Sequence, residues 1–515
     1  MTHKIQSSIK TYGLISAFSI TMFVLVMFAF QSSEYKAFGL TMAYKNQNIG
    51  NQTSPLAGMN FSKSVDVYSK NGVLKTTLVA EYKTGYIRNG AGAIVRNITA
   101  MVYNGSLPGP TFHVYPGDRF ELNLVNHLNE ATNLHWHGAH VSPAGISDNV
   151  LLSVAPGTTQ HYIVDIPKDH PPGVEWYHSH LHGLSYGQVS QGMSGVFIVE
   201  GIEKLLPTPL QHVTQHYFWM RDFPFDQLYM ATHTMGNSSH ELSNTATGAE
   251  WLTTNGEVNP TYNIKSGETQ LWRFANIGSE NYEVIEWPGH KFHVIAQDGN
   301  PVWKVNDTNN LFIPSGSRFD VLVTATGSGS IPLRLAASNY TEPRDYDNNV
   351  AKINIQGNQK PVNISYSNMS LRPQNSIYYD TVDLSNAKIA NQRVLNWSSD
   401  DTHWIYKINN QTFDHNRVDF KTKLGTVEEW KLRNLDTVES GNDHPFHIHV
   451  NDFQVMSVNG KPYHANGYQD TVLIPAAGEV VIRVPFRDFV GKSVFHCHLM
   501  FHGDYGMMGI FEVVK

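Results

Sequence analysis

Residues 116–124 read Pro-Gly-Asp-Arg-Phe-Glu-Leu-Asn-Leu, a turn followed by alternating apolar and polar residues. Successive side chains of an extended strand point to opposite faces, so Phe120, Leu122 and Leu124 would share one buried face. No long stretch beyond the N-terminus has helical periodicity, and the sequence therefore predicts an all-β protein built from β-sandwiches. The same period of two returns in three later runs: Tyr162, Val164 and Ile166; Phe319, Val321 and Val323; and Val480, Ile482 and Val484.

The length of the chain predicts several domains. It has 515 residues, which corresponds to three or four domains at about 150 residues each. Proline-rich and polar stretches at residues 205–210 and 357–374 are typical of boundaries. We therefore expect three consecutive sandwich domains after an N-terminal segment at 1–34 and a linker at 35–60. The predicted bounds of the three domains are 61–204, 205–358 and 372–515.

The N-terminal segment predicts export. Lys4 and Lys10 precede residues 12–30, a run of 19 residues without a charge. A spanning helix needs about 17–25 residues and a signal core about 7–15. We favour an uncleaved membrane anchor with both lysines inside, with a cleaved signal as the alternative. In either case the body lies outside the cytoplasm, anchored or secreted. Eleven Asn-x-Ser/Thr triplets fit a glycosylated surface, although triplets this short also arise by chance.

The composition excludes several classes of protein. Apolar residues make up 41% of the chain and charged residues 16%, which is unlike a disordered chain. A net charge of −7 argues against binding to nucleic acid or to anionic lipid. The chain has 26 His but a single Cys. One thiol forms no internal disulfide and no Cys-rich zinc or iron–sulfur site, and in an oxidising compartment it should have a protected use.

Paired histidines are the strongest pattern in the chain. Because residues i and i+2 of a strand face the same side, each His-x-His pair presents two imidazoles to one metal. The neutral ring nitrogen is a good ligand for copper, zinc, nickel and iron. The pairs occur twice in the first block and twice in the last: His135-Trp136-His137-Gly138, His178-Ser179-His180, His444-Pro445-Phe446-His447-Ile448-His449 and His496-Cys497-His498-Leu499-Met500-Phe501-His502.

The last of these segments indicates which metal is bound. A thiolate, two imidazoles and a weak thioether form the ligand set of blue copper. Cys497 supplies the sulfur, His502 lies five residues on, Met507 lies five further, and His444 completes the set from another strand. A structural zinc site has no use for Met, and there is no second Cys. Met508 is the competing axial ligand, and the spacing favours Met507.

The two histidines beside the cysteine predict a second metal site. His496 and His498 point to the opposite face of the strand from Cys497, so they can bind a different cluster through a short bonded route for electrons. Eight imidazoles remain after the blue-copper ligands are subtracted, enough for three coppers at two or three each. They come from the first and last blocks, so the cluster should lie between those domains. The eight are His135, His137, His178, His180, His447, His449, His496 and His498.

The four segments resemble the copper signatures of the three-domain multicopper oxidases, the laccase-like family. The resemblance covers about residues 65–515, includes all twelve ligand positions, and extends to the turn Leu107-Pro108-Gly109-Pro110-Thr111. It implies three cupredoxin-like Greek-key domains and four coppers per chain. Position by position it implies type 1 copper at His444, Cys497, His502 and Met507, type 2 copper at His135 and His447, one type 3 copper at His137, His178 and His498, and the other at His180, His449 and His496.

The resemblance also implies a mechanism. Four one-electron oxidations of a small donor at type 1 copper would feed the reduction of O2 to two waters at the trinuclear cluster. This reduction needs protons, and Asp148 lies where the family places a relay carboxylate, although it could be an ordinary turn residue. Many bacterial members carry Glu directly after the last His ligand. Here that position is Gly503, followed by Asp504, so the second proton donor stays open.

The electron donor and two other functions stay open at this point. The donor is a phenol or aromatic amine, or a metal ion such as Fe(II), Cu(I) or Mn(II), and we slightly favour a broad laccase-like role. Asp443 and Glu439 could bind a cation or be solvated. A copper nitrite reductase needs a blue site and one three-His copper. Half of the eight imidazoles would then have no metal to bind, which argues against this function. A non-enzymatic electron-transfer protein would bind one copper.

Overall fold

The computed structural model describes residues 60–224, 250–338, 348–367, 369–371 and 378–515, which belong to one unit, Gly58–Lys515. Strands dominate it, and the prediction of an all-β fold is confirmed. The helices among these residues are short. They are α2 (Ser185–Gln191), α4 (Met500–Asp504) and the 3-10 turns η1 (Ile202–Leu205), η2 (Thr208–Leu210), η4 (Tyr379–Thr381) and η5 (Leu384–Asn386).

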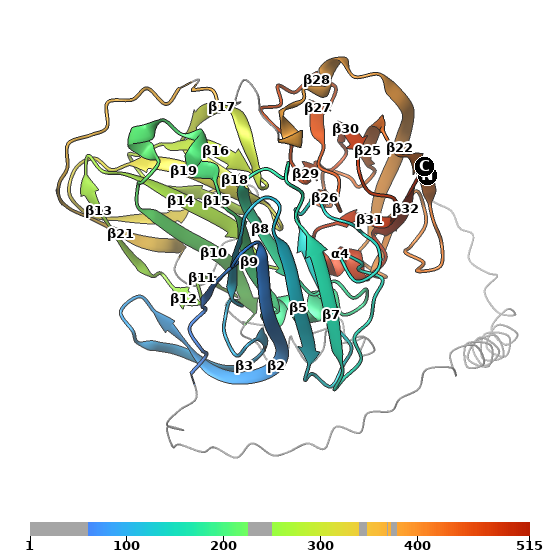
Figure 1. Cartoon of the computed structure of the whole chain (residues 1–515), viewed down its shortest axis with the longest axis horizontal. Coiled ribbons are helices and arrows are strands. Elements are labelled where there is room, and N and C mark those ends of the chain that lie inside the picture. The colour runs from blue at the N-terminus through green and yellow to red at the C-terminus, as the bar shows by residue number, and fades with distance from the viewer. Residues whose placement is uncertain (1–59, 225–249, 339–347, 368, 372–377) are drawn as a thin grey trace, which may run out of the picture. The chain divides into compact units, whose positions relative to one another are not determined.

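The first two predicted domains share one large sheet (Figure 1). One sheet of the first domain contains β1 (Asp66–Tyr68), β4 (Thr111–Val114), β9 (Ser194–Val199), β8 (Gly173–His178) and β6 (His135–His137). The eleven-stranded shared sheet contains β17 (Asn300–Thr308), β16 (Phe292–Gln297), β19 (Arg318–Thr324), β14 (Thr269–Asn276), β10 (Gln215–Pro224), β11 (Glu250–Thr254), β12 (Glu257–Val258), β2 (Val73–Asn89), β5 (Arg119–Asn126), β7 (Thr159–Asp165) and β3 (Ile94–Tyr103).

The remaining sheets complete the second and third domains. The second domain adds β13 (Thr261–Ser266), β21 (Asn349–Asn358), β20 (Gly329–Leu335), β15 (Glu283–Glu286) and β18 (Asn310–Ile313). The third contains β23 (Ile405–Ile408), β22 (Ile389–Asp400), β25 (Thr426–Asn434), β30 (Glu479–Phe486), β27 (Gln454–Val458) and β28 (Lys461–Pro462) in one sheet. Its other sheet contains β24 (Phe420–Lys423), β32 (Met508–Val514), β31 (Gly491–Cys497), β26 (His444–Ile448) and β29 (Thr471–Ile474).

The continuity of the shared sheet was not predicted. The short strand β12 pairs in parallel with β2, with Glu257 opposite Arg88 and Val258 opposite Asn89. Backbone hydrogen bonds therefore join the first and second domains. This connection depends on two residues that carry no sequence signal of their own, because strand pairing over such a distance is set by the tertiary fold.

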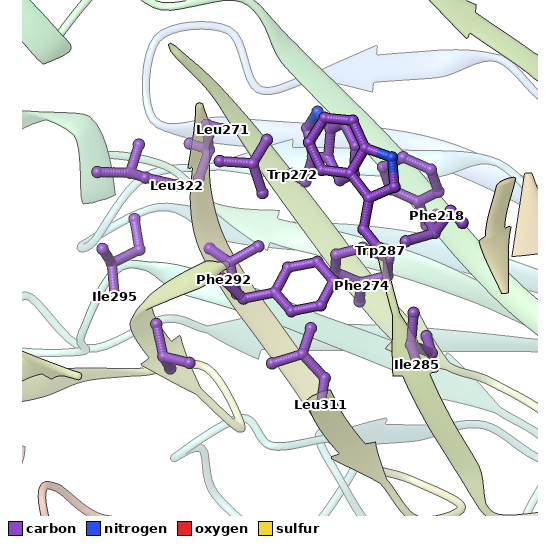
Figure 2. Packing of buried hydrophobic residues seen from close by; sticks show 14 of the residues in the cluster. Phe218, Leu271, Trp272, Phe274, Ile285, Trp287, Phe292, Ile295, Leu311 and Leu322 are labelled. Carbon is purple, nitrogen blue, oxygen red and sulfur yellow. The ribbon is translucent and has the colours of Figure 1, made fainter. Parts of the chain in front are cut away.

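Each domain has its own apolar core. Phe120, Leu122 and Leu124 are fully buried in the first core, as their alternation predicts. The second core is built around aromatic rings, with Trp272 and Trp287 4.9 Å apart between ring centroids (Figure 2). Apolar burial of this kind provides about 25 cal/mol per Å², and it fixes the sheets whose ends carry the histidines.

Strand β19 departs from simple alternation. Its apolar residues Val321 and Val323 are buried in the second core, but the polar residues Arg318 and Asp320 are equally buried. Asp320 accepts two hydrogen bonds from Arg273, at 2.8 and 2.9 Å. Both faces of this strand carry buried side chains, and its buried polar residues therefore need hydrogen-bond partners.

None of the helices among the described residues has the length and apolar character that a bilayer crossing requires. The predicted anchor or signal run at 12–30 lies outside the described residues.

Candidate metal centre

Three ligand atoms of the predicted blue site converge at one end of the third domain. His444 begins β26, Cys497 ends β31 and His502 lies in α4, and all three are buried. Cys497 Sγ is 3.6 Å from Nδ1 of His444 and 3.6 Å from Nδ1 of His502. The two Nδ1 atoms are 3.3 Å apart. This thiol and two imidazoles form a group of metal-ligand type.

The hydrogen bonds of this group fit a copper ion. The Nε2–H of His444 donates to Asp436 Oδ2 at 2.8 Å, so the lone pair at Nδ1 faces the sulfur. Burial lowers the pKa of His502 and raises the pKa of the Cys497 thiol. A neutral imidazole is the ligand form, and a metal cation would displace the thiol proton. Thiolate and imidazole together suit copper.

The two candidate axial methionines occupy different surroundings. Met507 is fully buried in the same core as Cys497, and its carbonyl accepts a hydrogen bond from the Cys497 N–H at 3.0 Å. Met508 instead packs with Val150 and Val494 in a separate apolar cluster. The neighbourhood thus agrees with Met507 as the axial ligand, which stays a prediction.

All eight remaining imidazoles meet between strands of the first and third domains. His135 stacks on His449 with 3.6 Å between ring centroids, and His137 stacks on His447 at 3.7 Å. Nε2 of His496 is 3.0 Å from Nε2 of His180. Three sets have ligand atoms within 4.8 Å of one another: His135, His137 and His178; His135, His447 and His449; and His180, His449 and His496.

The unpaired nitrogens of these rings fit metal binding. In six rings one nitrogen has a hydrogen-bond partner, and the other is buried with none among the described residues. A buried lone pair without a partner is costly unless a cation binds it. The six unpaired atoms are Nε2 of His135, His178, His447 and His498, and Nδ1 of His137 and His180.

Burial also keeps most of these rings in the form that binds metal. Loss of water around the ring disfavours the charged imidazolium, and neighbouring rings add to this effect. The pKa is lowered for His135, His137, His178, His180, His449, His496 and His498. The set is therefore suited to several coppers at one site.

Asp148 is fully buried beside this cluster. Its Oδ1 accepts hydrogen bonds from Nδ1–H of His135 at 2.8 Å and from the Trp136 N–H at 2.9 Å. Its Oδ2 has no hydrogen-bond partner among the described residues and lies 4.0 Å from Nδ1 of His449. Burial raises the pKa of Asp148 to about 8. One oxygen therefore orients the His135 ring, and the other is free to hold a proton.

Asp504 is buried on another side of the cluster. Its carboxylate accepts hydrogen bonds from the N–H groups of Gly183 and Tyr186, at 2.8 and 2.7 Å. Burial raises the pKa of Asp504 to about 7. With His180 and His496 it lines a cavity of about 20 Å³, which is room for one water. An adjoining cavity of about 210 Å³ also reaches His180.

The acidic residues considered for cation binding differ in their contacts. The Asp443 carboxylate accepts a hydrogen bond from the Ala476 N–H at 2.5 Å, so it holds a turn. Glu439 is exposed. The carboxylate nearest to the blue site is instead Asp436, which also accepts from Ser399 at 2.7 Å. No spacing rule links Asp436 to His444, and the sequence alone did not reveal it.

Three family models, each described as multicopper oxidase, match residues 90–204, 228–358 and 381–515. The chain belongs to the multicopper oxidase family. Its members are copper oxidoreductases that act with O2, and the chain is an oxidoreductase of this class. The resemblance seen in the sequence and the expectation of three cupredoxin-like domains are both confirmed.

Individual relatives agree with the family, and one of them is named for iron transport. The multicopper oxidase mco of Staphylococcus haemolyticus is 25% identical over 451 residues, covering 86% of this chain and 90% of that protein. The iron transport multicopper oxidase FET5 of Saccharomyces cerevisiae is 26% identical over 505 residues, covering 79% and 75%. A solved laccase from Pediococcus acidilactici has a TM-score of 0.71 at 23% identity, covering 88% and 94%.

Proposed function

We propose that this multicopper oxidase binds four coppers and couples the oxidation of a small reductant near His444 to the reduction of O2 to water. The observation that carries the proposal is the convergence of eight buried imidazoles beside Cys497; its chain neighbour His496 belongs to a group of metal-ligand type, and its other neighbour His498 lies against the rings of His137, His178 and His496. The copper ligands are proposed as the sequence placed them. The donor is a phenol or aromatic amine, or a metal ion.

Copper bound at the two sites would supply one-electron acceptance from the donor and four-electron reduction of O2. The role of the protein is to connect the two copper sites and to protect them. Cys497 is bonded through the backbone to His496 and His498, and the Nδ1–H of His496 donates to the Cys497 carbonyl at 2.9 Å. This gives a short path between the sites. Asp148 holds His135 and stands ready to exchange a proton.

On the side where the donor would approach, the His444 ring is covered by the carboxylate of Asp436. Asp436 covers Nε2 of His444, and Asn442 donates to Asp401 at 2.6 Å and to Ser399 at 2.8 Å. Burial raises the pKa of Asp436, but hydrogen bonds from His444 and Ser399 outweigh this effect and lower it below its ordinary value. Asp436 is therefore an anion near neutral pH, able to attract a cation or accept a phenolic proton.

Changing Asp436 to Asn should impair the oxidation of metal ions most. Asn keeps an oxygen for His444 but removes the negative charge, so kcat/KM for Fe(II) should fall about tenfold or more, a loss of about 1.4 kcal/mol. Loss of the charge should also raise the type 1 reduction potential. Steady-state kinetics and redox titration measure both. Glu439→Gln is the matched control and should change kcat/KM less than about twofold. A larger effect in Glu439→Gln would indicate that the cation binds at Glu439 instead of at Asp436.

The proposed function is tested on the purified full chain. We expect four coppers per chain and O2 uptake without release of peroxide, with four electrons taken from the donor per O2. A panel of phenols, aromatic amines, Fe(II), Cu(I) and Mn(II) identifies the donor. Nitrite consumption without O2 uptake would favour a nitrite reductase. A single copper without turnover would favour an electron carrier.

The location of the enzyme is part of the proposal. We place it outside the cytoplasm, attached to the membrane by its N-terminal segment or secreted. The fully buried position of the lone Cys497 fits an oxidising environment. Membrane fractionation and a glycosidase shift of the purified chain test the attachment and the glycosylation.

A further inference from the structure

None of the proposed copper ligands lies in the described part of the middle domain, but one of its turns contacts His498 of the third domain and reaches His137 of the first through Asp470. Residues 314–318 read Pro-Ser-Gly-Ser-Arg and lead into β19. Two side chains of this turn, Ser315 and Arg318, are fully buried. Each makes polar contacts that end at a histidine of the predicted trinuclear site.

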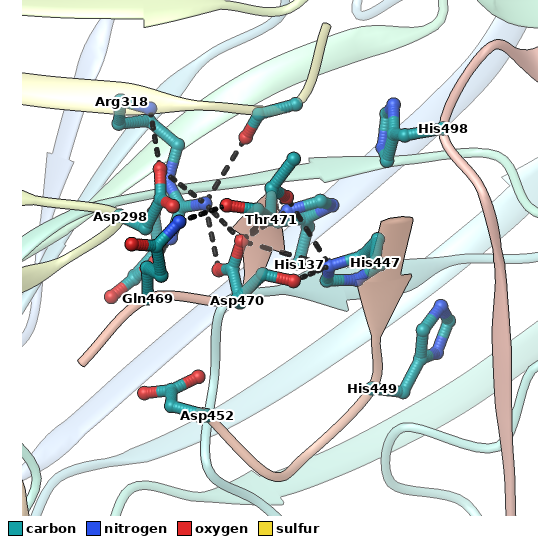
Figure 3. A network of polar contacts seen from close by, with 12 residues as sticks. His137, Asp298, Arg318, His447, His449, Asp452, Gln469, Asp470, Thr471 and His498 are labelled. Atoms are coloured by element: carbon teal, nitrogen blue, oxygen red, sulfur yellow. Dashed lines mark hydrogen bonds and ion pairs between the residues drawn. The ribbon is translucent and has the colours of Figure 1, made fainter. Parts of the chain in front are cut away.

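Arg318 connects all three domains (Figure 3). Its guanidinium donates to Asp470 of the third domain at 2.7 and 3.0 Å, and it pairs with Glu175 of the first. Within its own domain it lies 3.8 Å from Asp298. It also donates to the carbonyl of Val174 at 3.0 Å. A planar guanidinium has five donors spread over three nitrogens and can serve several carboxylates at once, whereas Lys has three donors on a single nitrogen.

Asp470 connects Arg318 to two of the histidines, His137 and His447. Its Oδ1 lies 3.2 Å from Nε2 of His137 and accepts from Thr471 at 2.8 Å. Its backbone carbonyl accepts from Nδ1–H of His447 at 2.9 Å. A proton on Nε2 of His137 leaves Nδ1 as the metal-binding atom, and that atom is the one without a partner.

Ser315 acts in the same way on a different ring. Its hydroxyl donates to the carbonyl of Gly278 at 3.1 Å, so its oxygen can accept from Nδ1–H of His498 at 3.2 Å. This leaves Nε2 of His498 free for metal. The next residue, Gly316, has a φ of +90°, and a side chain there would press against the His498 ring.

Glycine is needed at a second point of this network. Gly138, the last residue of the first histidine motif, has a φ of +86°. A side chain at this position would overlap the carboxylate of Glu175 and the guanidinium of Arg318. The histidine motif and the middle-domain turn are therefore packed against each other without spare room.

We propose that Ser315 and Arg318 of the middle domain are positioning residues for the trinuclear cluster, and that they select the ring nitrogens which His498 and His137 present to copper. The inference rests on the proposed function, because it takes these rings as copper ligands. It assigns to the middle domain a task in assembling the metal site in addition to its structural one.

A matched pair of buried arginines separates this task from ordinary stability. Arg273 is as buried as Arg318, and Asp320, its partner in an ion pair, belongs to the same strand as Arg318. No contact described for Arg273 reaches a copper ligand. Arg318→Met and Arg273→Met should both lower the Tm. Only the Arg318 variant should lose trinuclear copper.

The experiment reconstitutes each purified full chain with copper and counts metal by type. Wild type and Arg273→Met should hold four coppers. Arg318→Met should keep type 1 copper with its blue absorption but lose half or more of the other three, with a changed type 2 EPR signal. Full copper with an unchanged EPR signal in Arg318→Met, or the same loss in Arg273→Met, would overturn the proposal.

Two milder variants keep the test decisive if Arg318→Met does not fold. Ser315→Ala removes one acceptor and little volume, and should weaken the type 3 near-ultraviolet absorption and slow reoxidation by O2 about tenfold. Ser315→Thr, which restores the hydroxyl, should recover both. A Ser315→Ala variant with unchanged spectra would contradict the role of Ser315. If wild type itself binds no trinuclear copper, the proposed function fails, a result distinct from any difference between variants.

Discussion

Replacing Cys497 with Ser should abolish the blue absorption and the oxidation of donors together. The hydroxyl is nearly the same size as the thiol and fits the same buried position. It does not ionise at working pH and gives no sulfur-to-copper charge transfer, so the type 1 site loses its colour and its affinity. We expect donor turnover to fall about a thousandfold or more, equivalent to about 4 kcal/mol in the activation barrier.

The rest of the molecule provides internal controls for this variant. The backbone that joins Cys497 to His496 and His498 is unchanged, so three coppers and the type 2 EPR signal should remain. Met507→Leu is the matched comparison in the same apolar core. It conserves volume, and should keep the blue colour and shift only the type 1 potential. Turnover retained in Cys497→Ser would refute the proposed electron path.

Local sequence patterns predicted most of the fold, and together with the family resemblance they suggested a ligand set that stays a prediction. A period of two needs only neighbouring residues, which is why Phe120, Leu122 and Leu124 were correctly placed in a core. The same geometry explains why each His-x-His pair could be assigned to one face. The single Cys pointed to a protected use, and it is buried among ligand-type residues.

Contacts between distant segments could not be predicted in this way. Asp470 lies 333 residues from His137, and Ser315 lies 183 residues from His498. Nothing in their local sequence marks them, since Asp and Ser are common in turns. Arg318 precedes an alternating run that is typical of a half-exposed strand, and only the packing of three domains buries it. The ligands follow local rules, whereas the residues that orient them depend on the tertiary structure.

Asp148→Asn separates the relay of protons from the orientation of His135. The amide oxygen of Asn can still accept the hydrogen bonds from His135 and Trp136, which Oδ1 of Asp148 accepts now. The Oδ2 atom, which faces His449 at 4.0 Å, becomes an NH2 group that carries no exchangeable acid proton. Copper content and blue colour should therefore stay normal, while reoxidation of the reduced enzyme by O2 slows about tenfold to a hundredfold.

Asp148→Ala completes the comparison because it removes both functions of the carboxyl group. His135 then loses the acceptor that fixes its ring. This variant should therefore lose type 2 copper and also be reoxidised more slowly by O2. Rapid-mixing reoxidation, a solvent isotope effect and metal analysis distinguish the two variants. If Asp148→Asn reoxidises at the wild-type rate while Asp148→Ala loses copper, the carboxyl group only orients His135, and protons must reach the cluster by another route. Asp504, a buried acid with a raised pKa that lines the 20 Å³ cavity with His180 and His496, is the candidate for that route.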